Sequence, residues 1–157
     1  MPIRPFVPED REPLRRLIEA TKVFRPEEVD VALELMDEEI NDPTQEEYIL
    51  RTYADEGDAV RGYYCVGRTP MTAATWDLYW IVVDPTVHGR GIGAELIRDC
   101  EGVVAERGGR LVFVETSSKP SYEPTRRFYR KNSYDQAAVI KDYYADGDDL
   151  VVFTKRV

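Results

Sequence analysis

The stretch WDLYWIVVDPTVHGRGIGAELI, residues 76–97, decides the fold of this chain. Residues 78–83 place apolar side chains on both alternating sides, which is typical of a central strand covered on two faces. A loop with three glycines follows, and the apolar spacing then becomes that of a helix, with Leu96, Ile97, Cys100 and Val104 on one side. The run Leu111–Glu115 adds another strand. Together they predict a strand-helix-strand unit, which requires parallel strands and a right-handed crossover.

The sequence on either side of this unit continues the pattern of one α/β (α+β) domain. A short strand and two helices precede a hairpin, and a fourth helix and two strands close the chain. The expected segments are Ile3–Phe6, a helix capped by Asp10, a second helix from near Pro26 to Ile40, Tyr48–Tyr53, Ala59–Gly67, Thr125–Lys131, Ala137–Tyr143 and Leu150–Thr154. We expect residues 1–157 to form a single domain, large enough to fold without disulfide or metal staples.

Composition excludes several classes of function. The net charge of -9 repels phosphate backbones and anionic lipid. One histidine and two scattered cysteines provide no zinc-spaced cluster, so we expect no metal. Cys65 and Cys100 both fall on apolar faces and are interpreted as buried, reduced thiols. With no apolar leader or membrane-length run, the sequence predicts a cytoplasmic protein without nucleic acid or membrane partners, and it leaves a homodimer open.

The glycine loop is typical of a pyrophosphate-binding turn. Glycines let the backbone approach a ligand closely, and the helix that follows presents unpaired N–H groups and a partial positive charge. A nucleoside triphosphate loop would need a Gly-Lys-Ser/Thr sequence that is absent here. A dinucleotide fingerprint is formally met by Gly89, Gly91 and Ala94, with Glu115 as a ribose-binding acid. However, residues 84–88 separate that fingerprint from its strand, and little chain remains for a doubly wound sheet.

These residues resemble the GNAT superfamily of acyl-CoA-dependent N-acetyltransferases. The family signature Q/R-x-x-G-x-G/A falls on residues 88–93, after the strand and turn Ile81–Pro85, and the similarity extends from about Leu78 to Tyr134. His88 departs from the Gln or Arg of the first signature position. The resemblance implies a mixed, mostly antiparallel sheet of about six to seven strands, with a parallel pair at the CoA site and about four flanking helices.

The resemblance also implies acetyl-CoA as cosubstrate. In this family the amides of the glycine loop hold the CoA pyrophosphate. A backbone N–H of the central strand, here of Val82 or Val83, stabilises the oxyanion that forms when the amine attacks the thioester. The residues assigned to acetyl-CoA are Ile81, Val82, Val83, His88, Gly89, Arg90, Gly91, Ile92, Gly93 and Ala94.

An amine acceptor needs a base, because an alkylammonium with a pKa near ~10.4 is only about one part in 10³ free amine at pH 7. The resemblance and the strand-helix-strand geometry both point to Glu115, at the carboxyl edge of the sheet where α/β proteins place ligands. A structural ion pair or a capped turn is the alternative role for this carboxylate. Asp77 and a water relay are substitute bases.

The CoA thiolate that leaves needs a proton, and the family motif F-Y-x-x-x-G-F matches residues 128–134. The resemblance assigns Tyr129 as the general acid, and a simple hydrogen bond to the thiolate or a packed aromatic ring are the alternatives. Ser133 replaces the usual glycine, so we expect the left-handed residue at the helix end to be Asn132.

The predicted function is acetyl transfer from acetyl-CoA to a primary amine, on a small molecule or a protein N-terminus. Two alternatives share the glycine loop, a non-catalytic acyl-CoA-binding module and a dinucleotide-binding oxidoreductase.

Overall fold

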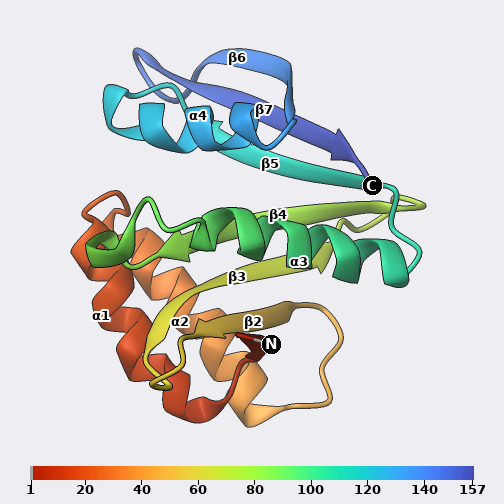
Figure 1. Cartoon of the computed structure of the whole chain (residues 1–157). Coiled ribbons are helices and arrows are strands. Elements are labelled where there is room, and N and C mark those ends of the chain that lie inside the picture. Colours follow the sequence, from red (N-terminus) through yellow and green to blue (C-terminus); the bar gives the residue numbers. More distant parts are fainter. Residues whose placement is uncertain (1) are drawn as a thin grey trace. The chain divides into compact units, whose positions relative to one another are not determined.

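Within residues 2–157, which the computed structural model describes, the chain forms seven strands and four α-helices (Figure 1). Their order along the chain is the predicted one. Three short 3-10 helices lie at Pro8–Asp10, Pro85–Val87 and Pro120–Tyr122. The main elements are β1 Ile3–Pro5, α1 Arg11–Thr21, α2 Pro26–Asn41, β2 Ile49–Ala54, β3 Val60–Arg68, β4 Thr75–Val83, α3 Ile92–Glu106, β5 Leu111–Ser117, α4 Glu123–Lys131, β6 Asp135–Ala145 and β7 Asp148–Arg156.

The strands form one mixed sheet in the order β1-β2-β3-β4-β5-β7-β6. Strands β4 and β5 are parallel, with Thr75 opposite Leu111 and Asp77 opposite Phe113. The pairs β1–β2, β2–β3, β5–β7 and β6–β7 are antiparallel. The predicted fold class and the predicted parallel pair around a helix are therefore confirmed.

Residue contacts divide the chain into two compact units. The first comprises Met1–Gly67 and Trp80–Cys100, and the second comprises Arg68–Tyr79 and Glu101–Val157. Both β4 and α3 run through the boundary between them. A single domain stays a prediction.

In the first unit, helices cover both faces of β2 and β3. Tyr63 and Cys65 point into a core built by the apolar stripes of α1 and α2, with Leu14, Ile18, Ala32 and Met36 among its members. Tyr64 points the other way, because side chains alternate along a strand. Its hydroxyl donates to Asp99 on α3 at 2.7 Å. This alternation explains why β3 is buried over almost its whole length.

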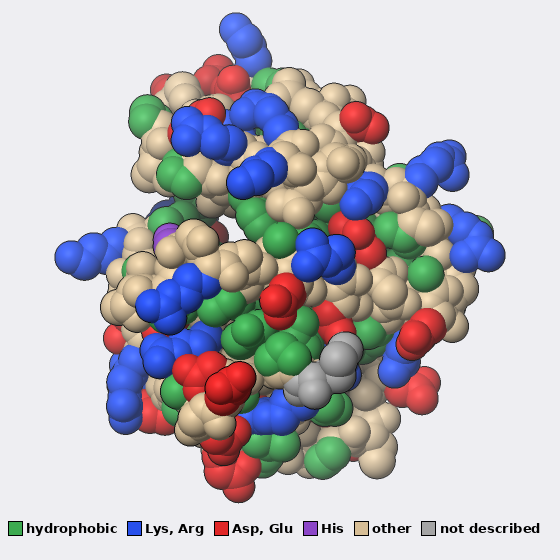
Figure 2. Space-filling model, in the orientation of Figure 1, with side chains coloured by type: hydrophobic (Ala, Val, Ile, Leu, Met, Phe, Trp, Pro, Cys, Tyr) green, Lys and Arg blue, Asp and Glu red, His purple; other side chains and the backbone are tan. Residues whose placement is uncertain are grey.

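In the second unit, α4 packs on one face of β5 and β7. Tyr129 of α4 stacks on Phe153 with ring centroids 5.9 Å apart. Tyr134, just after the helix, donates to Glu101 at 2.9 Å, and Lys155 binds the same carboxylate at 3.0 Å. On the face drawn in Figure 2, basic side chains gather over α4 at the top of the view. Arg130 and Lys131 lie in its last turn, where the helix dipole favours cations.

Three expectations about local structure have clear outcomes. Cys65 and Cys100 are buried free thiols, as predicted. The second face of β4 is more open than predicted, because Tyr79 is 38% exposed. The left-handed residue after α4 is Ser133, with φ 70°, and the assignment to Asn132 is wrong. The side-chain amide of Asn132 instead donates to Phe128 O at 2.8 Å. This bond holds Asn132 at the helix end, so the left-handed conformation falls on Ser133.

Candidate active site

The glycine loop of the first unit enters α3 through two left-handed residues. Gly89 has φ 84° and Gly91 has φ 78°, a conformation that costs other residues about 1–2 kcal/mol. A Cβ built on either glycine would meet no heavy atom within 4 Å. These glycines are therefore needed for backbone conformation, and the space beside them is open to a ligand.

The first turn of α3 leaves backbone donors available next to these glycines. The helical hydrogen bonds start with Glu95 N, which donates to Gly91 O at 3.1 Å. The amides of Ile92, Gly93 and Ala94 precede this bond, and they lie at the positive end of the helix dipole. Backbone donors, a positive dipole and open space fit a pyrophosphate group.

His88 occupies the divergent position of the signature. Its side chain is exposed, and Nε2 lies 3.2 Å from Val83 O, so the tautomer with a proton on Nε2 donates to the end of β4. The ring therefore supports the turn between β4 and the loop.

Charged side chains hold the start of the loop. Asp84 accepts from Thr86 N at 2.9 Å and from Arg61 at 3.1 Å, and Arg61 also binds Asp55 at 2.8 Å. Burial alone would raise the pKa of Asp84, but the hydrogen bonds from Thr86 and Arg61 lower it. Asp84 is therefore a stable anion that fixes the turn, a role that sequence reasoning did not assign.

A glycine that sequence reasoning also missed lets β3 approach the end of β4. A Cβ on Gly62 would lie 2.6 Å from Val82 O and 3.1 Å from Leu96 Cδ1. The close approach places the backbone of Val82 against β3 and the first turns of α3. Val82 is buried, and its neighbours Ile81 and Val83 are half-buried.

Glu115, in the second unit, shares a face of the sheet with Asp77. Asp77 is opposite Phe113, and Phe113 and Glu115 are two residues apart on β5, so the three side chains point the same way. Burial and the negative charge of Asp77 raise the pKa of Glu115, although its side chain still reaches solvent. Burial also raises the pKa of Asp77. Within residues 2–157, neither carboxylate forms an ion pair, so the structural role considered for Glu115 finds no basic partner.

Tyr144 is a neighbour of Glu115 in the second unit. It is the one residue of β6 that is not exposed. The β6–β7 register breaks between Ile140 and Ala145, and this bulge turns Tyr144 inward. Burial, with the charge of Glu115 as the next cause, raises the pKa of Tyr144 to about 12. Tyr144 is therefore a neutral phenol beside the carboxylate.

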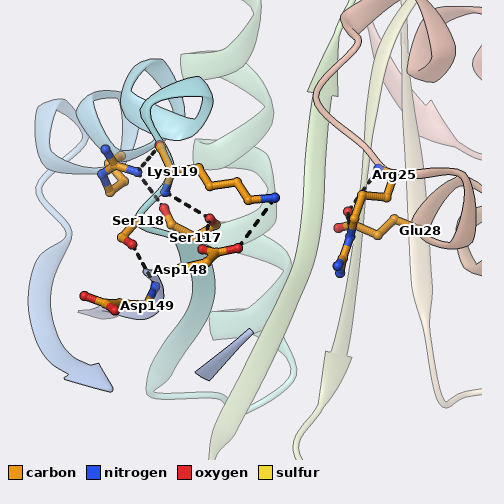
Figure 3. A network of polar contacts seen from close by, with 8 residues as sticks. Arg25, Glu28, Ser117, Ser118, Lys119, Asp148 and Asp149 are labelled. Atoms are coloured by element: carbon orange, nitrogen blue, oxygen red, sulfur yellow. Dashed lines mark hydrogen bonds and ion pairs between the residues drawn. The ribbon is translucent and has the colours of Figure 1, made fainter. Parts of the chain in front are cut away.

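A polar network fixes the carboxyl end of β5 (Figure 3). Ser117 Oγ donates to the buried Asp148 at 2.5 Å, and Lys119 N donates to Ser117 Oγ at 3.0 Å. Asp149 N donates to Ser118 Oγ at 2.7 Å. Figure 3 also shows Arg25 and Glu28 as a pair at the start of α2. Because Ser117 lies two residues after Glu115, the network anchors the strand that carries the carboxylate.

Tyr129 lies on the opposite face of β5 and β7 from Glu115. Its ring stacks on Phe153, which is opposite Val114, whereas Glu115 is opposite Val152. Edge contacts to Phe128 and Tyr134, at 5.3 and 5.4 Å between centroids, hold the ring in place. The two predicted reacting side chains therefore approach this part of the sheet from different sides.

Residues 2–157 contain no group of three or more His, Cys, Asp or Glu side chains arranged to hold a metal ion. No helix in this range is both long and apolar enough to cross a membrane.

Residues 13–134 match the Acetyltransferase (GNAT) family. The chain belongs to this family. A solved GNAT-family structure from Desulfovibrio desulfuricans is 39% identical, with a TM-score of 0.93 over 98% of this chain and 97% of that chain. An aminoglycoside 6'-N-acetyltransferase complexed with coenzyme A is 23% identical, with a TM-score of 0.79 over 99% and 97% of the two chains. A ribosomal-protein-S18-alanine N-acetyltransferase from Escherichia coli is 14% identical, with a TM-score of 0.76 over 99% and 92%. A search of curated proteins found no match.

Family membership identifies a GNAT acetyltransferase, an enzyme of a family that uses acetyl-CoA. The dinucleotide-binding alternative is wrong, because the mixed sheet lacks the doubly wound parallel topology that this alternative requires.

Proposed function

We propose that this GNAT acetyltransferase passes an acetyl group from acetyl-CoA to a primary amine, on a small molecule or a protein N-terminus, by direct attack on the thioester. The carboxylate pair of Glu115 and Asp77 carries the proposal. Two negative charges on one face without a basic partner favour binding of a cation, and a primary amine is a cation at neutral pH.

Glu115 is the general base. A raised pKa makes a carboxylate a stronger base. It accepts a proton from the ammonium, and the free nitrogen lone pair forms the new N–C bond. Asp77 attracts the ammonium electrostatically and is the substitute base, with a water relay as the other route for the proton.

The glycine loop and the end of β4 bind the donor. The amides from Gly89 to Ala94 hold the CoA pyrophosphate, and a backbone N–H of Val82 or Val83 stabilises the oxyanion. When the C–S bond breaks, the hydroxyl of Tyr129 donates to the thiolate. Full proton transfer from a phenol of pKa about 10 to a thiolate of pKa about 8.5 is uphill by roughly 2 kcal/mol, so a strong hydrogen bond supplies much of this stabilisation.

The test is acetyl-CoA-dependent thiol release with four acceptor classes: small amines, amino acids, aminoglycosides and peptides with free N-termini. Two structural neighbours act on an aminoglycoside and on a protein alanine. At 23% and 14% identity they share the fold with this chain, so neither class takes precedence. We expect rapid release with at least one class and a loss of 10²-fold or more in Glu115→Gln.

Glu106→Gln is the matched control, because Glu106 is an exposed carboxylate at the end of α3. It should keep wild-type turnover. Stabilisation by CoA without thiol release in any class would contradict the proposal and favour the non-catalytic acyl-CoA-binding alternative.

A further inference from the structure

Strand β6 is a long, open edge of the sheet. It has eleven residues, it is the last strand in the sheet order, and β7 is its neighbour on one side. The opposite edge, β1, has only three residues and includes Pro5. A long edge strand presents a row of unpaired backbone N–H and C=O groups, which is a template for pairing with another strand.

The middle of β6 is apolar on both faces. Between two breaks in register, residues Ala138, Val139 and Ile140 pair regularly with β7. Val139 and Ile140 point to opposite faces, because side chains alternate, and they are 48% and 50% exposed. Two exposed, β-branched side chains on a regular edge segment favour further strand pairing over contact with water.

Opposite charges lie at the two ends of this apolar segment. Asp135 precedes it and Lys141 follows it, and within residues 2–157 neither side chain has a hydrogen-bond or ion-pair partner. The carboxylate of the next residue, Asp142, accepts from Gly147 N at 2.8 Å, so it is engaged in the hairpin turn. The order of features along β6 is thus an unpaired anion, an apolar segment and an unpaired cation.

We propose that two copies of this chain associate by antiparallel pairing of their β6 edges. Strands related by a two-fold axis perpendicular to the sheet run antiparallel, so the Asp135 end of one copy lies beside the Lys141 end of the other. The pairing makes the opposite-charge contact twice and brings the two apolar segments together. No other protein of complementary charge needs to be invoked, because the strand complements itself.

Two physical terms limit the strength of this dimer. Each copy carries a charge of -9, but at physiological salt this repulsion is screened beyond about 8 Å, whereas the contacts between the strands are local. A contact centred on a short strand segment is smaller than the roughly 800 Å² per partner of a standard interface. We therefore expect a reversible dimer with a micromolar dissociation constant.

Sedimentation equilibrium in physiological salt, from low to high micromolar protein, tests the proposal. Wild-type protein should dimerise. Asp135→Lys and Lys141→Asp should each raise the dissociation constant at least tenfold, because each change puts like charges together at both ends. The double variant Asp135→Lys with Lys141→Asp restores opposite charges and should recover most of the wild-type affinity.

Lys131→Asp is the matched control, since Lys131 is an exposed residue of α4 and lies outside β6. It should dimerise like wild type, and circular dichroism should show that all variants are folded. A wild-type protein that stays monomeric at the highest concentration would overturn the proposal, and so would a double variant no tighter than the single ones. The readout is independent of catalysis, so it stands or fails separately from the proposed acetyl transfer.

Discussion

Replacing Gly91 with alanine separates ligand binding by the glycine loop from the contribution of that loop to folding. Gly91 has φ 78°, and alanine in this region costs about 1–2 kcal/mol. Alanine also reduces the conformational entropy of the unfolded chain, which offsets about 0.4–1 kcal/mol of this cost. The net loss of stability is therefore roughly 1 kcal/mol. For a chain of this length, that loss lowers the melting temperature by about 2–4 °C.

Gly108→Ala is the matched control. Gly108 has φ 84°, and like Gly91 it has no heavy atom within 4 Å of a built Cβ. Both substitutions should therefore lower the melting temperature by a similar amount. Only Gly91→Ala should weaken CoA binding, because its methyl group would enter the open space beside the loop and move the pyrophosphate away from the loop amides. Losing one amide hydrogen bond to a charged phosphate costs about 1.5–3 kcal/mol, or at least tenfold in Kd. Equal CoA affinities of the two variants by isothermal titration calorimetry would refute the assignment of this loop.

Gly62→Ala should destabilise the fold by about 1–3 kcal/mol, because its Cβ would lie 2.6 Å from Val82 O. Gly102→Ala, in open space on α3, should instead stabilise it by up to about 1 kcal/mol, and a thermal melt that ranks the two variants the other way would contradict this packing. Tyr129→Phe keeps the stacked ring and should lower kcat by about 10²-fold with CoA affinity nearly unchanged. Tyr134→Phe removes a hydroxyl that binds Glu101 and should leave kcat at the wild-type value, so equal rates in the two tyrosine variants would remove Tyr129 from the mechanism.

Local patterns in the sequence predicted the elements that carry the glycine loop. The change of apolar spacing after Val83 marks the end of β4, and the glycines mark the start of α3, because these signals depend on neighbouring residues only. The position of Glu115 on a strand parallel to β4 followed from the same strand-helix-strand unit.

Features that depend on long-range register were not predictable. Asp77 and Glu115 share a face because of the pairing of β4 with β5, and no local pattern states which residues become opposite. The inward orientation of Tyr144 depends on a bulge that is set by the pairing of β6 with β7. The left-handed conformation of Ser133 follows from the side-chain hydrogen bond of Asn132, which competes with the turn that this residue was expected to form.

The pH dependence of kcat/KM with the best acceptor tests most directly whether Glu115 is the base. Activity should rise with pH through the raised pKa of Glu115, because only the ionised carboxylate accepts the proton. Asp77→Asn removes a negative charge that raises this pKa, so the acidic limb should move to lower pH, and Glu115→Gln should lose both the limb and most of the rate. An acidic limb that stays in place in Asp77→Asn, together with near wild-type turnover in Glu115→Gln, would contradict the assignment of Glu115 as the base.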